Sequence, residues 1–135
     1  EIVVARPEEL DGRVRVDQRT VVVIMTHNYE RDLELLPLAL ASPSPYVGLL
    51  GPKSRADRLL ADLGAITCNR LYAPIGVDIG AESPEEIALS ILAEARAVLA
   101  GRSAGLLRDR AGAIHDPPSA SPDPARCRRM VRLYG

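Results

Sequence analysis

Short apolar runs alternate along this chain with longer repeats of helical spacing. The run Thr20–Thr26 is β-branched and nearly all apolar, as expected of a strand covered on both faces in a parallel sheet. Tyr46–Gly51 has the same character and ends in glycine, while Arg70–Ala73 predicts a third short strand or extended segment. Near the start, Glu1–Pro7 has the pattern of a short buried strand that proline stops.

Two helical repeats separate these runs. Leucines at helical spacing predict a helix over Glu30–Leu40, in which Pro37 should produce a kink or limit the helix to its first half. We expect Asp32 and Glu34 on the exposed surface of this helix. A second helix is predicted over Pro52–Leu63, because proline suits the first turn and a glycine follows the last.

A third helix has the best-marked start. Ser83 is the expected N-cap, Pro84 suits the first helical position, and Glu86 completes a Ser-x-x-Glu capping box. The acidic first turn also suits the positive end of the helix dipole. Apolar residues then form a broad face that we expect to pack in the core: Ile87, Ala88, Ile91, Leu92, Ala95, Val98 and Leu99.

This order of strands and helices predicts an α/β fold, in which a parallel sheet is flanked by helices and joined by right-handed crossovers. Residues 1–116 are long enough for one such domain with a modest core. Residues 117–135 are rich first in proline and then in arginine, so we predict a Pro-rich and basic tail there.

Composition narrows the possible classes of function. The chain has four Tyr, no Phe, no Trp and a net charge of -1, which disfavours stacking on nucleic-acid bases and general polyanion binding. No apolar run reaches membrane-spanning length and no signal peptide is visible. We therefore expect a cytoplasmic protein with no nucleic-acid partner and no membrane partner.

The cysteines and histidines lie far apart in the sequence. Cys68 and Cys127 allow a single disulfide, although two reduced thiols are the better expectation in the cytoplasm. His27 and His115 have no neighbours at metal-ligand spacing. No metal site is therefore predicted.

Three turns of the chain fall at the edge where an α/β sheet binds its ligands, outside the carboxyl ends of the strands. The first turn follows the strongest strand, the second leads through glycine and two cations into a helix, and the third is a stiff loop with an aspartate between two glycines. The candidate binding residues in these turns are Thr26, His27, Asn28, Gly48, Gly51, Lys53, Arg55, Pro74, Gly76, Asp78 and Gly80.

Each of these groups also has a purely structural interpretation. His27 could act as an acid, act as a base or hydrogen-bond a ligand, or it could simply cap the next helix. No nucleophile or metal partner accompanies it in the sequence, so no catalytic residue is assigned. Lys53 and Arg55 could bind an anion at the N-terminus of a helix, or they could be solvated residues at the start of that helix. Asp78 either orients a ligand or ties its turn together. The second turn matches neither G-x-x-x-x-G-K-[ST] nor G-x-G-x-x-G.

Three stretches share the motifs of one known family. They are Thr20–Asp32 (TVVVIMTHNYERD), Tyr46–Arg55 (YVGLLGPKSR) and Ala73–Glu94 (APIGVDIGAESPEEIALSILAE). Together they resemble the C-terminal Rossmann domain of the XdhC/CoxI family, accessory factors of xanthine dehydrogenase and related molybdenum hydroxylases. The resemblance runs from about Val21 to Pro117, and its third stretch is long and specific.

This resemblance implies a Rossmann-like domain that binds the molybdenum cofactor, holds it during sulfuration by a cysteine desulfurase, and delivers it to an apo molybdenum hydroxylase. It also implies a homodimer and no substrate turnover by the domain itself. The motifs of the family fall here on Thr26–His27, on Gly48–Gly51 and on Pro74–Asp78, with Gly80 following.

The sequence departs from the family pattern in several places. Asn28 stands where the family commonly has aspartate, and Gly51–Arg55 replaces a Gly-Ser-Arg/Lys-Arg motif. The first strand, glycine-rich turn and helix of the family domain are not recognised, nor is its N-terminal domain with a cysteine motif. An NAD(P)-binding oxidoreductase domain is the alternative function, although its glycine fingerprint is missing. An interaction module that uses the basic tail is a third interpretation.

Overall fold

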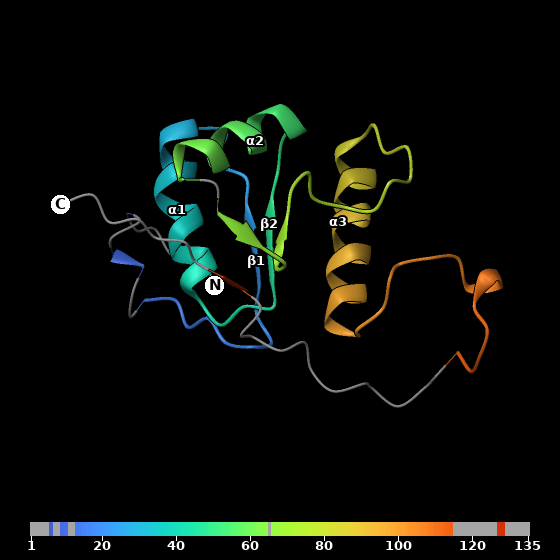
Figure 1. Cartoon of the computed structure of the whole chain (residues 1–135). Helices are drawn as coiled ribbons and strands as arrows, with labels where there is room; N and C mark the ends of the chain where they lie inside the picture. Colours follow the sequence, from blue (N-terminus) through green and yellow to red (C-terminus); the bar gives the residue numbers. More distant parts are fainter. Residues whose placement is uncertain (1–5, 7–8, 11–12, 65, 115–126, 129–135) are drawn as a thin grey trace.

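The computed structural model describes residues 6, 9–10, 13–64, 66–114 and 127–128. Within this part of the chain, a parallel three-stranded sheet has α1 and α2 on one face and α3 on the other (Figure 1). In chain order these elements are β1 (Val21–Ile24), α1 (Tyr29–Ala41), β2 (Tyr46–Leu49), α2 (Lys53–Asp62), β4 (Leu71–Tyr72) and α3 (Pro84–Leu99).

The three strands are arranged in the order β1-β2-β4, and both neighbouring pairs are parallel. Val21 of β1 lies opposite Tyr46 of β2, and Val47 of β2 lies opposite Leu71 of β4. Among the strands of the described residues, β1 therefore lies at an edge of this sheet and β2 at its centre. The arrangement confirms the predicted α/β, Rossmann-like fold, and the predicted elements differ from the observed ones mainly at their ends.

The core is built almost wholly from aliphatic side chains between the sheet, α1 and α2. All four residues of β2 are buried, and Leu36 of α1 and Leu59 of α2 have no exposed surface. Removing these side chains from water supplies the main driving force for the fold. The buried cluster consists of Ile24, Leu36, Ala39, Leu40, Val47, Leu49, Ala56 and Leu59.

The first helix continues past its proline. α1 runs through Pro37 to Ala41, so the prediction that proline limits the helix to its first half is wrong. Leu36 precedes the proline, Leu40 follows it, and both are buried. The burial of this face offsets the backbone hydrogen bond that Pro37 does not donate.

A second, two-stranded sheet is not predicted by the sequence pattern. β3 (Thr67–Cys68) pairs antiparallel with β5 (Cys127–Arg128), so two residues of the predicted basic tail form a strand. Strands this short carry almost no periodic signal. The strand predicted over Glu1–Pro7 lies, apart from its sixth residue, outside the described residues, as does the proline-rich stretch 116–124.

The third helix packs through only part of its predicted apolar face. Ile91 and Ala95 are buried on the sheet side, as predicted. Ala88, Leu92 and Leu99 are exposed, so the prediction that they enter the core is wrong. A helix that covers one face of a sheet buries only one side, and no described element covers the opposite side of α3.

Candidate functional site

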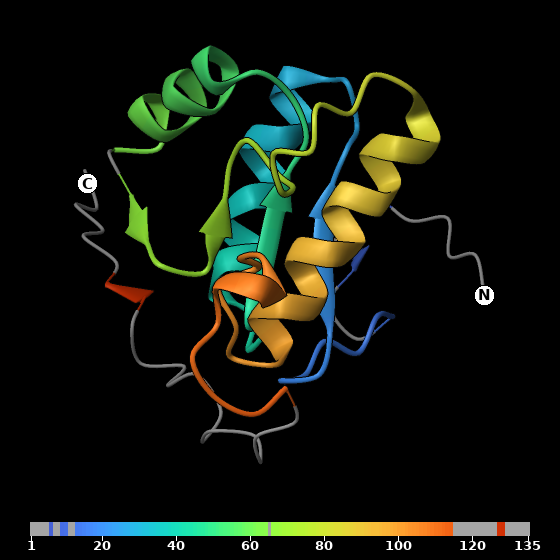
Figure 2. The same ribbon diagram turned by 90° about the vertical axis from the view of Figure 1, so that its right-hand side faces the viewer.

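All three parallel strands end at one edge of the sheet, and α1, α2 and α3 begin at that edge (Figure 1; Figure 2). The turns that hold the candidate residues are the connections from β1 to α1, from β2 to α2 and from β4 to α3. The fold thus brings the three turns together, as the strand order predicts. The surroundings of the individual side chains differ from turn to turn.

A buried carboxylate joins the first two turns. Asp32, in the first turn of α1, is only 1% exposed, so the prediction that it lies on the surface is wrong. Thr26 donates its hydroxyl hydrogen to Asp32 Oδ1 at 2.5 Å, and Arg55 Nη2 lies 2.6 Å from Asp32 Oδ2. A desolvated carboxylate requires such partners. The ion pair of Arg55 with Asp32 therefore holds the two turns together, while Thr26 fixes the carboxylate within the first turn.

The turn after β1 presents His27 to solvent. Its φ of 56° lies in the left-handed region, which is uncommon for a residue with a side chain. Asn28 has a structural function, because its side-chain oxygen accepts a hydrogen bond from Arg31 N at 3.0 Å and caps α1. Of these two neighbours, His27 is the one whose side chain faces outward on a constrained backbone.

The turn after β2 opens the N-terminus of α2. Gly51 has a φ of 133°, which residues with a Cβ atom rarely adopt. Pro52 is the N-cap and makes no side-chain cap hydrogen bond, whereas Asn28 caps α1 and Ser83 caps α3. Arg55 N donates to Pro52 O, so among the described residues the amides of Lys53 and Ser54 are the ones at this helix start without an acceptor, and Lys53 is exposed. This combination suits an anionic group.

Close packing explains the glycine in the middle of β2. A Cβ atom at Gly48 would collide with the side chain of Ile75, which lies in the turn after β4. Pro74 precedes Ile75 in that turn and is itself preceded by a cis peptide bond. Gly48 thus lets the third turn lie against the central strand. The glycine is needed there for packing.

Hydrogen bonds from α3 fix the third turn. Gly76 N donates to Glu94 Oε2 at 2.8 Å, and the Ser90 hydroxyl donates to Val77 O at 2.5 Å. Farther along, Asp78 Oδ1 accepts a hydrogen bond from Gly80 N at 3.4 Å. Asp78 therefore ties its own turn together, and its exposed side chain keeps further acceptor capacity towards solvent.

The sequence pattern misses the group that anchors this turn to the sheet. The Tyr46 hydroxyl donates to Glu94 Oε2 at 2.6 Å, and the Tyr46 ring stacks on Tyr72 with centroids 4.5 Å apart. Burial and the Glu94 carboxylate raise the pKa of Tyr46 far above its ordinary value of 10.0, so its hydroxyl remains a donor at neutral pH. A glutamate on the sheet-facing side of an apolar helix is the signal that points to this contact.

The isolated cysteines and histidines form no recognisable chemical centre. In the part of the chain that the structure describes, no three His, Cys, Asp or Glu side chains gather around a possible metal position. Cys68 lies opposite Cys127 in the β3–β5 pair, and His115 is outside the described residues. Among the described helices, none has both the length and the apolar character needed to cross a bilayer.

Comparison with known proteins places this geometry in a family. The family model described as the XdhC Rossmann domain matches residues 1–95, which include every candidate residue named above. The chain belongs to the XdhC family. The XdhC domain seen here thus has its three candidate turns in the matched region, while η2 (Leu107–Asp109) and β5 follow it.

Three relatives show how this XdhC domain compares in length. A protein of Bacillus subtilis (strain 168), named as a probable xanthine dehydrogenase subunit, is 35% identical over 94 residues, which are 70% of this chain and 28% of the relative. The uncharacterized protein YqeB of Escherichia coli (strain K12) is 37% identical over 91 residues, 64% of this chain and 16% of the relative. The crystal structure of a xanthine dehydrogenase from Bacillus halodurans has a TM-score of 0.65 and 35% identity, covering 75% of this chain and 30% of that chain. The chain spans less than a third of each relative's length.

Proposed function

We propose that this XdhC domain binds the molybdenum cofactor at the carboxyl edge of its sheet and carries it for a molybdenum hydroxylase of the xanthine dehydrogenase type. The observation that carries the proposal is the uncapped N-terminus of α2 beside the exposed Lys53, at the same edge as His27 and Asp78. These groups suit binding and orientation, and none of them forms a catalytic constellation. The domain therefore carries its ligand without converting it.

The available donors fit the two ends of a pterin with a phosphate tail. The first amides of α2 and the Lys53 ammonium suit the phosphate. His27 and Asp78 are exposed on the neighbouring turns and suit hydrogen bonds to the polar ring. Arg55 contributes indirectly, because its ion pair with Asp32 fixes the first turn relative to the second. When bound, the cofactor supplies the molybdenum chemistry, and the residues of the chain hold and orient it.

The names of two relatives support the partner class. Both are described as xanthine dehydrogenase or as part of it. We therefore propose an apo molybdenum hydroxylase as the recipient of the cofactor, and a cysteine desulfurase as the enzyme that sulfurates it while the domain holds it. In this proposal the protein works in the cytoplasm, as a homodimer.

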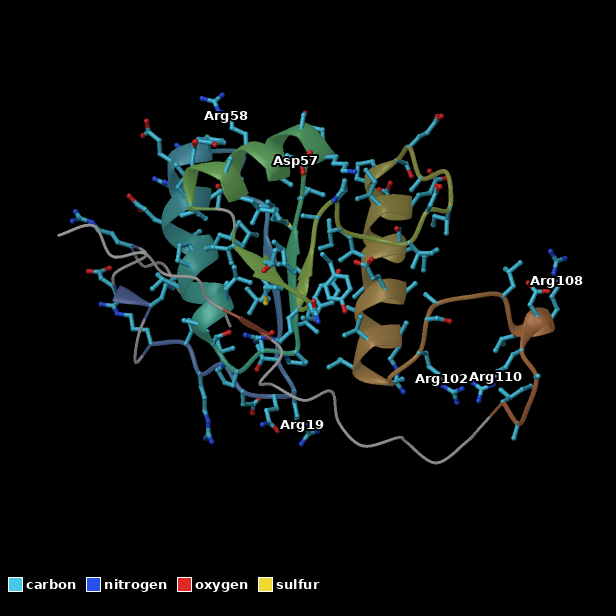
Figure 3. The ribbon with its side chains drawn as sticks, in the orientation of Figure 1. Arg19, Asp57, Arg58, Arg102, Arg108 and Arg110 are labelled. Carbon is cyan, nitrogen blue, oxygen red and sulfur yellow. The ribbon has the colours of Figure 1, made fainter. Side chains whose placement is uncertain are left out.

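Equilibrium binding of molybdopterin to the purified chain tests the proposal. We expect the unaltered chain to bind, and Lys53→Ala to weaken binding by roughly tenfold, the worth of one charge-assisted contact. Arg19→Ala is the matched control. Arg19 is an exposed cation that precedes β1, at the opposite end of the sheet (Figure 3), so its removal should leave the affinity unchanged.

Three other outcomes would contradict the proposal. Equal losses in Lys53→Ala and Arg19→Ala would mean that general electrostatic attraction, and not the start of α2, holds the ligand. Binding of a nicotinamide nucleotide with hydride transfer, and no binding of molybdopterin, would favour the oxidoreductase alternative. Binding of neither ligand, while an apo-hydroxylase still binds the chain, would identify an interaction module.

A further inference from the structure

The outer side of α3 carries a regular stripe of exposed residues. Leu89 is 60% exposed, Leu92 is 66% exposed and Leu99 is 38% exposed. Glu85 and Arg96, also exposed, complete the stripe, so its members follow one another at alternating steps of four and three residues. That spacing is the seam along which two helices pack. We refer to these five residues as the α3 stripe.

The stripe lies away from the sheet. At 3.6 residues per turn, its members are centred roughly 140° around α3 from the middle of the buried side, which Ser90, Ile91 and Ala95 form together. Three leucines at such exposure on one helix face form an apolar patch that a soluble domain seldom leaves uncovered. A fitting occupant is apolar opposite Leu89 and Leu92, basic opposite Glu85 and acidic opposite Arg96.

The charges of the stripe are complementary to a second copy of the stripe itself. Along the helix the order is acid, leucine, leucine, base, from Glu85 through Leu89 and Leu92 to Arg96. Consider an antiparallel copy related by a two-fold axis that passes midway between Leu89 and Leu92. This axis places Leu89 of each copy against Leu92 of the other. The same axis sets Glu85 of each copy against Arg96 of the other. Among the described residues neither of these charges has an ion-pair partner within its own chain.

The segments at the two ends of α3 also carry exposed apolar residues. Ile79, in the turn before α3, is 50% exposed. Leu106 and Leu107, in the segment after α3, are 60% and 65% exposed. Both segments project from α3 on the side away from the sheet (Figure 1). The antiparallel arrangement brings the segment after α3 of one copy next to the turn before α3 of the other, apolar against apolar.

We propose that the outer side of α3 is a homodimer interface, formed by antiparallel packing of α3 against α3 of a second copy. A parallel arrangement is disfavoured because it sets Glu85 beside Glu85 and Arg96 beside Arg96. α2 begins at the carboxyl edge of the sheet and runs over the face that α1 covers (Figure 1), so the dimer leaves Lys53 of both copies accessible. The interface and the proposed cofactor edge are thus separate surfaces.

Analytical ultracentrifugation of the whole chain tests this interface without any ligand, so its outcome is independent of the cofactor proposal. The unaltered chain should be dimeric in the micromolar range. Glu85→Arg sets two arginines against each other, and Arg96→Glu sets two glutamates against each other. Each single change should therefore weaken dimerisation by roughly tenfold or more. The variant with both changes should recover the dimer, because the pairs are then opposite in charge again.

Leu92→Glu should give a monomer, and Leu38→Glu is its matched control. Leu38 lies on α1, away from the α3 stripe, and is 51% exposed, so the same substitution there should leave the dimer intact. Circular dichroism checks that each variant keeps its helices. A chain that stays monomeric at all concentrations overturns the proposal, and so does a dimer that withstands both single charge reversals. A dimer lost in both single variants and not regained in the double variant overturns the antiparallel register.

Discussion

Gly76 is the residue at which backbone conformation and close packing constrain the chain together. Its φ is 108°, and a Cβ atom there would collide with the Ser90 hydroxyl that bonds to the neighbouring Val77 carbonyl. We expect Gly76→Ala to lower the free energy of unfolding by about 2–4 kcal/mol, since the strain and the collision add. Urea denaturation measures this change.

Gly80→Ala in the same turn separates the two causes. Gly80 has a φ of 67°, and a Cβ atom there has no neighbour within 4 Å. Its substitution should therefore cost only the backbone term, about 1 kcal/mol. Equal losses in the two variants would show that contact with Ser90 is unimportant.

At the residue scale, sequence distance decides which contacts can be predicted. The Ser83–Glu86 capping box is local, so its letters predict it, and the structure confirms it. The partners Arg55 and Asp32 are 23 residues apart, and their ion pair depends on how the sheet brings two turns together. No spacing rule indicates that pair. The sequence therefore predicts Arg55 as a ligand-facing cation, although a buried carboxylate engages it.

At the scale of single elements, the start of α3 depends on one carboxylate. Amide hydrogen bonds from Ser83 and then from Glu82 hold the pKa of Glu86 below its ordinary value of 4.5. A lowered pKa in the folded state means that the stabilisation is present above 4.5 and is lost as the pH falls through the folded-state pKa.

Glu86→Gln should therefore lower the melting temperature at neutral pH and reduce the loss of stability in acid. Thermal melting followed by circular dichroism from about pH 3 to about pH 7 covers the relevant window. Glu30→Gln is the control, since Glu30 is exposed in the acidic first turn of α1, a helix that the Asn28 side chain caps without a capping box. The same acid response in both variants would rule out a specific contribution of the capping box.

Element by element, the apolar pattern predicts where helices and strands form better than it predicts what covers them. The apolar pattern is sufficient to predict the buried sides of α1 and α2, because both helices pack on the central strand. It fails for Leu92 of α3, because periodicity identifies an apolar side but not the layer that meets it. It fails for Pro37 because the burial of the neighbouring leucines in the core outweighs the low helix propensity of proline.

At the scale of the whole molecule, one hydroxyl connects three parts of the fold. Tyr46 lies in the central strand, its partner Glu94 lies in α3, and the same carboxylate oxygen holds Gly76 of the third turn. Tyr46→Phe should destabilise the protein by about 1–2 kcal/mol, because Glu94 loses a partner inside a half-buried contact.

Tyr29→Phe is a matched control for that change. The Tyr29 hydroxyl donates to Asp62 at 2.7 Å, but this contact is exposed, so its loss should destabilise the protein less than the loss of the Tyr46 contact does. Chemical denaturation of both variants gives the comparison. A loss in Tyr46→Phe no larger than that in Tyr29→Phe would contradict the assigned link between strand, helix and turn.

β1 has one flank that no second strand occupies among the described residues. Amides and carbonyls along such a flank can bond to any extended segment that arrives from outside. Where that flank is open in solution, copies of the protein have a second way to associate, which should grow with concentration and heat and end in aggregates of no fixed size. Reversing a charge on α3 has no influence on that process, so only the discrete, reversible species in a sedimentation experiment reports on the helix.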